Sequence, residues 1–123
     1  MPSVLVVDDD KSYRQYLVEI CEGIDFDVFY SSDATQCMQM MESLQPDLLI
    51  IDLIMPNIDG AQLIKEIRKS NTKTPILVVT GSDDQELIQK SRDNGANEVL
   101  TKPFKQADIF KQLKGLLASS FNE

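Results

Sequence analysis

Residues able to take part in phosphoryl or metal chemistry follow the short apolar runs of this 123-residue chain. They are Asp8, Asp9, Asp10, Asp52, Thr80 and Lys102. Carboxylates that lie close together repel one another, and some take up protons unless a cation is bound between them. A hard divalent cation such as Mg²⁺ prefers a few carboxylate oxygens, a carbonyl oxygen and waters. The aspartates therefore indicate a Mg²⁺ site, provided that the fold brings them together.

The same residue types suit the transfer of a phosphoryl group. A carboxylate such as that of Asp52 is already ionised at neutral pH and can attack phosphorus without a general base. The transferring group spreads its charge over three oxygens, so fixed positive groups around it stabilise the transfer. Mg²⁺ would contact one oxygen, the compact Lys102 ammonium a second, and the Thr80 hydroxyl with backbone N–H groups the third. The set indicates acceptance of a phosphoryl group.

Each residue also has an ordinary structural interpretation. The aspartates at 8–10 could cap a helix, because aspartate suits the N-cap and the first turn. Asp52 could be a loop acid, and Lys102 could be a solvated amine. Thr80 could belong to a turn. These interpretations, taken one by one, do not explain why acid, hydroxyl and amine all follow apolar runs.

Five apolar runs are predicted to be strands, at residues 4–7, 28–30, 48–51, 76–79 and 98–100. The first, third and fourth are continuously apolar, as strands are when both faces of a parallel sheet are covered. Stretches with helical spacing of apolar residues alternate with them, at 13–24, 34–44, 63–67, 87–91 and 109–117. Strict alternation predicts an α/β fold, a doubly wound five-stranded parallel sheet with helices on both faces. In such sheets ligands bind beyond the carboxyl ends of the strands, where the six polar residues stand.

Composition excludes several functions. The net charge of -8 opposes direct binding of nucleic acid, and no basic cluster offsets it. The chain has no histidine, which removes Ser-His-Asp and Cys-His catalysis and histidine zinc sites. Any phosphohistidine must therefore belong to another protein. The two cysteines, Cys21 and Cys37, lie on apolar helix faces and are predicted to be buried and reduced.

The sequence offers no membrane or secretion signal. No apolar run approaches the length of a membrane span, and the first residues lack the pattern of a secretory signal. We therefore expect no membrane insertion and a cytoplasmic location. The length fits one domain.

The sequence resembles a known family in five motifs. They are Asp8-Asp9, Asp52-Leu53-Ile54-Met55-Pro56, Asp59-Gly60, Thr80-Gly81 and Lys102-Pro103-Phe104. In type and spacing they are similar to the response-regulator receiver domain of two-component signalling, in its chemotaxis-regulator-like, single-domain form. The resemblance implies a flavodoxin-like (βα)5 fold with strand order 2-1-3-4-5. We expect one receiver domain over residues 1–123, with its core at about 3–118.

The resemblance implies a role for each matching residue. Asp52 is expected to be the phosphoacceptor. The expected ligands of Mg²⁺ (or Mn²⁺) are Asp8, Asp9, Asp52 and the backbone carbonyl of Ile54. Thr80 and Lys102 are expected to contact the phosphoryl group. The residues expected to shape the surrounding loops are Pro56, Gly60 and Pro103, with a cis bond between Lys102 and Pro103.

The implied function is phosphorelay signal transduction. A sensor histidine kinase or a histidine phosphotransfer protein would donate the phosphoryl group. The receiver would catalyse its own phosphorylation and dephosphorylation without being an enzyme toward another substrate. It would then switch the surface that it presents to a downstream protein target or to an output domain outside this chain.

One position, Val99, departs from the usual pattern of the family, and two others bear on the lifetime of the phosphoryl group. Val99 stands where the family often has an aromatic residue that moves inward on activation, so a switch through that side chain is in doubt. In the family, the positions that Ile54 and Ser82 occupy here flank the path of the water that hydrolyses the phosphoryl group. An isoleucine cannot orient that water, which predicts slower self-dephosphorylation than in an Ile54→Asn variant.

Other interpretations place the chemistry elsewhere. A haloacid-dehalogenase phosphatase would use Asp8 as its nucleophile, but the sequence lacks the later acid cluster of those enzymes and Asp52 would have no role. A binding module that keeps the fold but has lost phosphorylation would lack the acceptor, an acid or the lysine, and all are present. A flavodoxin would need a phosphate-binding loop where three aspartates stand. Mapping the phosphorylated residue separates the first of these from a receiver.

Overall fold

A computed structural model describes residues 2–56 and 58–121, with the side chains of 119–121 left aside. Its main sheet has five parallel strands in the order β2-β1-β3-β6-β7. These strands are β1 (Ser3–Val7), β2 (Asp27–Ser31), β3 (Leu48–Ile51), β6 (Ile76–Thr80) and β7 (Glu98–Thr101). When only these five strands are numbered, in their order along the chain, the strand order is 2-1-3-4-5. The predicted α/β fold and strand order are therefore confirmed.

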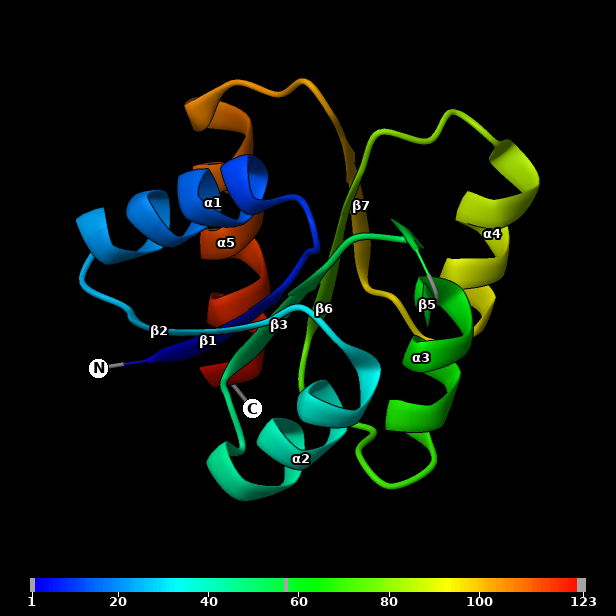
Figure 1. Cartoon of the computed structure of the whole chain (residues 1–123). Helices are drawn as coiled ribbons and strands as arrows, with labels where there is room; N and C mark the ends of the chain where they lie inside the picture. The colour runs from blue at the N-terminus through cyan, green and yellow to red at the C-terminus, as the bar shows by residue number, and fades with distance from the viewer. Residues whose placement is uncertain (1, 57, 122–123) are drawn as a thin grey trace.

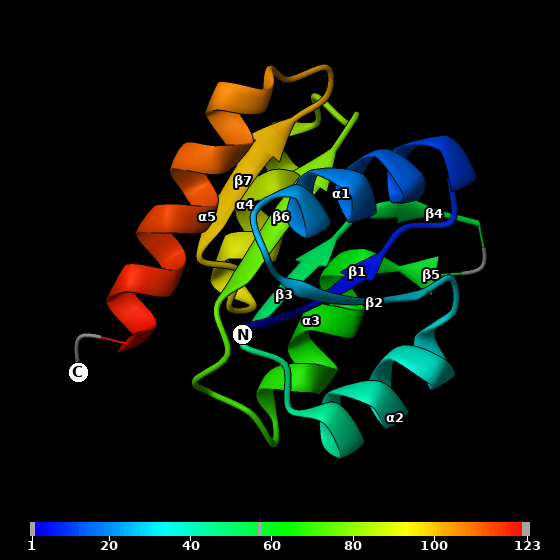
Figure 2. The ribbon, with the colours of Figure 1, turned by 90° about the vertical axis from the view of Figure 1, so that its left-hand side faces the viewer.

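Five helices cover the two faces of this sheet. They are α1 (Lys11–Gly23), α2 (Ala34–Leu44), α3 (Gly60–Arg68), α4 (Gln85–Asp93) and α5 (Gln106–Phe121). Figure 1 shows α1 and α5 on one side of the sheet, and α3 and α4 on the other side with α2. The view turned by 90° shows the arrows of β3, β6 and β7 directed toward the same end of the sheet (Figure 2). In the described part of the chain, no helix is long and apolar enough to cross a membrane.

The strands are buried on both faces, which is why they read as unbroken apolar runs. Successive side chains of a strand point to opposite faces, so the core divides into two clusters. The side chains that pack with α2, α3 and α4 include Leu5, Val7, Leu49, Ile51, Ile76 and Val78. Those that pack with α1 and α5 include Val4, Val6, Leu48, Ile50, Leu77 and Val79.

Aspartates begin four of the helices. Asp10, Asp33, Asp59 and Asp84 each precede a helix and accept hydrogen bonds from its first backbone N–H groups. These caps satisfy donors that have no partner within the helix. Part of the acidity of the chain therefore has a structural purpose, and the capping interpretation is correct for Asp10 but not for Asp8.

Both cysteines are small core residues, as predicted. Cys21 and Cys37 are fully buried and unpaired, on opposite faces of the sheet. Burial raises the pKa of each thiol to about 12, so both remain protonated at neutral pH.

A short hairpin after β3 was not anticipated from the sequence. It consists of β4 (Ile54–Met55) and β5 (Ile58–Asp59), which pair in antiparallel fashion. Two-residue strands carry too little pattern to be recognised by alternation. The hairpin matters because it directs the chain from Asp52 to the start of α3.

Candidate functional site

Lys102 joins two carboxylates at the carboxyl ends of the strands. Its Nζ donates to Asp8 Oδ2 at 3.0 Å and to Asp52 Oδ2 at 3.1 Å. Asp8 and Asp52 follow β1 and β3, the neighbouring central strands, and Lys102 follows β7. Three residues that are up to 94 positions apart in the sequence therefore meet in one partly buried cluster.

Asp8 is the deeper of the two carboxylates. It is 1% exposed, and its Oδ1 accepts the backbone N–H of Asp10 at 2.9 Å. Burial raises the pKa of Asp8, and the Asp52 charge adds to the rise, although the Asp10 N–H and Lys102 oppose it. An acid in this position is costly to ionise, and a further cation would make its ionisation easier.

Asp52 is held in place and is only 6% exposed, but it borders a pocket that opens to solvent. Its Oδ1 accepts the backbone N–H of Ile54 at 3.1 Å, and its Oδ2 contacts the ammonium. The side chain lines an open pocket of about 650 Å³. Asp8 and Asp52 thus differ, because only Asp52 combines a fixed carboxylate with access from outside.

Lys102 keeps its positive charge despite its burial. Burial alone would lower the pKa of the ammonium, but the hydrogen bond and charge of Asp8 together with those of Asp52 raise it above the ordinary value. The backbone N–H of Lys102 donates to the carbonyl of Thr80 at 2.8 Å. The bond between Lys102 and Pro103 is cis, in agreement with the expectation.

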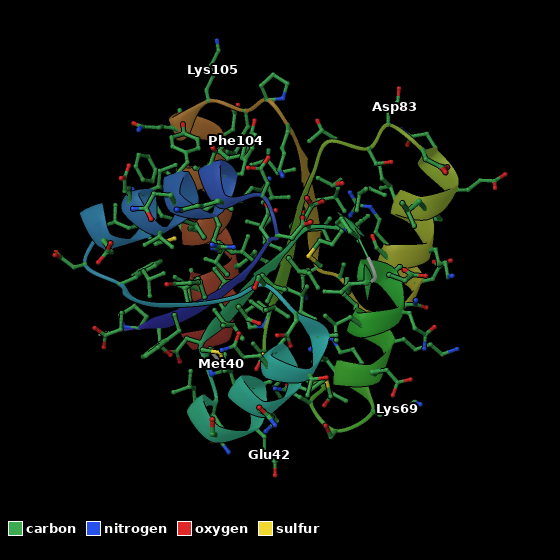
Figure 3. The ribbon with its side chains drawn as sticks, in the orientation of Figure 1. Met40, Glu42, Lys69, Asp83, Phe104 and Lys105 are labelled. Atoms are coloured by element: carbon green, nitrogen blue, oxygen red, sulfur yellow. The ribbon has the colours of Figure 1, made fainter. Side chains whose placement is uncertain are left out.

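The pocket lies at the end of the molecule where the loops after β6 and β7 are found. Figure 3 shows Asp83 and Phe104 at this end, while Met40, Glu42 and Lys69 lie at the opposite end. The residues that line the pocket are Asp9, Asp10, Tyr13, Asp52, Ile54, Gly81, Ser82 and Lys102. Asp9 is exposed at this pocket, whereas Thr80 and Asp8 are buried.

Thr80 and Val99 occupy different surroundings. Thr80 is fully buried, and its Oγ1 accepts the backbone N–H of Ser82 at 3.2 Å, which ties the side chain to the loop after β6. Val99 is half-buried in β7 and packs against the core cluster on the α2, α3 and α4 face. The hydroxyl is therefore coupled to the pocket loop, and the valine is coupled to the core.

Gly60 permits the close packing of the loop after β3. A Cβ at this position would lie 2.5 Å from the backbone oxygen of Asp52 and 2.6 Å from Leu53 Cα. Any other residue would push on the backbone that carries Asp52. Its partner in the predicted loop, Pro56, is exposed.

The donor set fits a hard divalent cation. Asp9, Asp52 and Ile54 line one pocket, and Asp8 contacts the same ammonium as Asp52. Among the described residues, no three acidic, cysteine or histidine side chains already form a compact metal cluster. Mg²⁺ does not need one, because it keeps several waters and takes only one or two carboxylates from the protein.

Tyr13 is the site residue that the sequence did not single out. Its ring lies over the Lys102 ammonium, with Nζ 4.1 Å from the ring centroid. The spacing suggested only an apolar position on α1. The available signal was its place three residues after the Asp10 cap, because a helical side chain covers the turn that precedes it.

Comparison with known proteins identifies the relatives of this chain. Residues 4–114 match the sequence model of the response regulator receiver domain. The alkaline phosphatase synthesis transcriptional regulatory protein PhoP of Bacillus subtilis is 31% identical over 95% of this chain and 49% of its own length. The response regulator MprA of Mycobacterium ulcerans is 32% identical over 93% of this chain and 49% of its own. The chain thus spans about half the length of these curated relatives.

Solved structures have the same fold. A putative response regulator from Chloroflexus aurantiacus is 30% identical with a TM-score of 0.89, covering 96% of this chain and 99% of that one. The signal receiver domain of an HD domain-containing protein from Pseudomonas fluorescens is 28% identical with a TM-score of 0.91, covering 97% and 88%.

Proposed function

Because the chain belongs to the response regulator receiver domain family of two-component systems, we propose that it accepts a phosphoryl group on Asp52. The observation that carries the proposal is the geometry of one carboxylate. Asp52 lines the open pocket, and its Oδ2 lies 3.1 Å from the Lys102 ammonium. A nucleophilic oxygen therefore stands beside the positive charge that a phosphoryl group requires.

The transfer exchanges one bond to phosphorus for another. A carboxylate oxygen of Asp52 forms the new O–P bond while the P–N bond of a phosphohistidine breaks, and the imidazole leaves with the electron pair and takes up a proton. Lys102 stabilises the charge on the phosphoryl oxygens. Asp8 keeps Lys102 in place through its own contact at 3.0 Å.

We assign the binding of Mg²⁺ (or Mn²⁺) to Asp8, Asp9, Asp52 and the backbone carbonyl of Ile54. When bound, the cation supplies positive charge for the carboxylates and for a phosphoryl oxygen. The raised pKa of Asp8 supports this assignment, because an acid that is costly to ionise gains from a second cation.

The receiver is proposed to act in a phosphorelay in the cytoplasm. A sensor histidine kinase or a histidine phosphotransfer protein is the proposed donor, and the chain contributes no histidine of its own. Residues 1–123 are proposed as one receiver domain with its core at about 3–118. The target is a downstream protein or an output domain beyond this chain. The receiver catalyses its own phosphorylation and dephosphorylation and acts on no other substrate.

The position of the acids favours this assignment over a phosphatase with Asp8 as its nucleophile. Asp8 is 1% exposed and does not belong to the lining of the pocket. Asp52 is the carboxylate that combines pocket access with the Lys102 contact.

The test is phosphorylation by acetyl phosphate, followed by intact-protein mass spectrometry. We expect one added phosphoryl group in Mg²⁺ and none in EDTA, and we expect Asp52→Ala to remove it. Labelling that persists in Asp52→Ala, or that ignores EDTA, contradicts the assignment.

The switch is proposed to run through Thr80 rather than Val99. The Thr80 hydroxyl already contacts the backbone of Ser82, and Gly81 between them has open space around it. A new phosphoryl group offers the hydroxyl a strong acceptor, which draws the loop at 81–84 inward. Val99 is too short to move between surface and interior.

Amide NMR shifts with and without beryllofluoride test this switch. We expect the shifts on α4 to be lost in Thr80→Ala and kept in Val99→Ala. The reverse pattern would show that the side chain in β7 carries the change.

A further inference from the structure

The Lys102 ammonium has an aromatic neighbour besides its two carboxylates. The Tyr13 ring lies 4.1 Å from Nζ, measured to the ring centroid. A cation over the face of an aromatic ring is attracted by the negative charge density of that face, more strongly where water is partly excluded. Lys102 therefore contacts a neutral group that attracts it, in addition to Asp8 and Asp52.

The ring of Tyr13 is itself held from two sides. The backbone N–H of Tyr13 donates to the capping carboxylate of Asp10 at 3.3 Å. Its ring contacts Tyr16 at 6.3 Å and Phe104 at 6.1 Å between centroids, and Tyr16 stacks on Phe104 at 5.8 Å. Phe104 follows Lys102 by two positions, in the loop before α5 (Figure 3). These three rings, Tyr13, Tyr16 and Phe104, form an aromatic trio that joins the start of α1 to the segment that carries the Lys102 ammonium.

We propose that Tyr13 is a positioning residue for Lys102 in phosphoryl transfer. The proposal rests on the proposed function of Asp52. During transfer, the Asp52 oxygen that contacts Lys102 changes its charge and its bonds, so this contact cannot hold the ammonium throughout. The Tyr13 ring keeps the same contact before and after. Because the ring is neutral, it attracts the ammonium without repelling an incoming phosphoryl group, as a third carboxylate would.

Two readouts in the same set of variants test the proposal. The first, in the unphosphorylated protein, is the NMR order parameter of Lys102 Cε and the ring-current shift of its methylene protons. The second is the rate of phosphorylation by acetyl phosphate at saturating donor and Mg²⁺. The variants are Tyr13→Leu, which removes the ring, and Tyr13→Phe, which keeps it. Tyr16→Leu is the matched control, because Tyr16 belongs to the aromatic trio and is not part of the pocket lining.

Tyr13→Leu is expected to make Lys102 Cε mobile, to abolish its ring-current shift and to slow phosphorylation about tenfold, the change that on the order of 1.4 kcal/mol produces. Tyr13→Phe should keep both readouts close to the wild type, and Tyr16→Leu, which leaves the ring over Lys102 in place, should change them much less than Tyr13→Leu does. Fluorinated phenylalanines at position 13 keep the shape of the ring and weaken its negative face, so the rate should fall stepwise with each fluorine. In a Lys102→Met background, Tyr13→Leu should cause no further slowing.

An unchanged Lys102 side chain in Tyr13→Leu overturns the proposal. Equal losses in Tyr16→Leu overturn it too, because they would show a general effect of the aromatic trio. If the wild type takes up no phosphoryl group on Asp52, the proposed function fails, and the Lys102 order parameter still decides whether Tyr13 positions the ammonium.

Discussion

Two partly buried cations of this protein stand in opposite kinds of surroundings. Lys102 contacts the carboxylates of Asp8 and Asp52. Arg68, at the end of α3, donates to the carbonyls of Gly95 and Asn71 and to the side-chain oxygen of Asn97, at 2.9–3.1 Å. Within the described part of the chain, Arg68 has no carboxylate partner. One cation therefore balances charge, and the other satisfies neutral oxygens.

The pKa values of the two cations follow from this difference. Burial lowers the pKa of Arg68, whereas the carboxylates raise the pKa of Lys102 in spite of burial. Arg68 keeps its charge in any case, because an arginine is protonated at all ordinary pH values. Its contacts connect α3 with the α4–β7 loop. The carboxylates around Lys102 can bind another cation in place of its ammonium, which suits the proposed phosphoryl transfer. The Arg68 contacts instead suit a role in stability.

The largest expected effect comes from removing each cation in turn. Lys102→Met leaves Asp8 and Asp52 facing each other, and we expect it to lower the free energy of unfolding at pH 7 without Mg²⁺ by about 3 kcal/mol. Saturating Mg²⁺ should remove most of this loss, since the carboxylates then have a cation again. Arg68→Met leaves carbonyls without donors, and we expect a loss of about 2 kcal/mol that Mg²⁺ does not change. Urea unfolding with Mg²⁺ or EDTA measures both.

The pH dependence of these variants separates them further. The folded-state pKa of Asp8 is raised, so the native state binds more protons than the unfolded chain. The contribution of Asp8 to stability therefore falls as pH rises from its ordinary pKa of 3.8 through the folded-state pKa. Without Lys102, which lowers the pKa of Asp8, this fall in stability with rising pH should be larger. Arg68→Met should lose the same amount at acid and neutral pH. If the loss of unfolding free energy in Lys102→Met were the same with and without Mg²⁺ and at all pH values, the comparison would be wrong.

A second pair of variants uses the glycine in each region. In Gly60→Ala the new Cβ meets backbone beside Asp52 at 2.5 Å. We expect a loss of about 2 kcal/mol and a phosphorylation rate lowered about 10–100-fold, because Asp52, the proposed acceptor, shifts. In Gly95→Ala the Cβ meets the Arg68 side chain at 2.6 Å, and the φ of 123° strains an alanine. We expect a loss of about 1–2 kcal/mol with the rate kept.

Thermal unfolding and acetyl phosphate labelling of both glycine variants are the measurements. The comparison predicts that only the Gly60 variant loses phosphorylation at a temperature where both proteins are folded. Equal loss of labelling in the Gly95 variant would show that the Arg68 region also controls the acceptor.

The smallest expected effect concerns the wall of the pocket. Ile54 is 55% exposed, and its backbone N–H, not its side chain, contacts Asp52. Ile54→Asn keeps that bond and adds an amide able to orient water. We expect self-dephosphorylation about fivefold faster, the change that a hydrogen bond of about 1 kcal/mol produces. Phosphate release from the two phosphorylated proteins measures it, and equal rates would exclude a role for this side chain.

The sequence determined the elements and the type of site. Buried parallel strands must be apolar on both faces, so residues 4–7, 48–51 and 76–79 can be recognised as strands from the sequence. The polar residues that follow them must then lie at one end of the sheet. The short β4–β5 hairpin was not predicted, because strands of two residues are too short to show an alternating pattern of apolar and polar residues. Gly60 was recognised from its motif. The reason that a glycine is needed there, its close approach to the backbone of Asp52, is visible only in the structure.

Only the tertiary structure decided which groups share a contact. Asp8, Asp9 and Asp10 are neighbours of one type in the sequence, yet the fold buries the first beside Lys102, leaves the second exposed at the pocket and makes the third a helix cap. Tyr13 and Arg68 likewise look like ordinary helix residues until α1 and α3 are packed. Periodicity is local and fixes the face on which a side chain lies, whereas a contact between residues 94 positions apart depends on how the strands and loops that carry them are packed together.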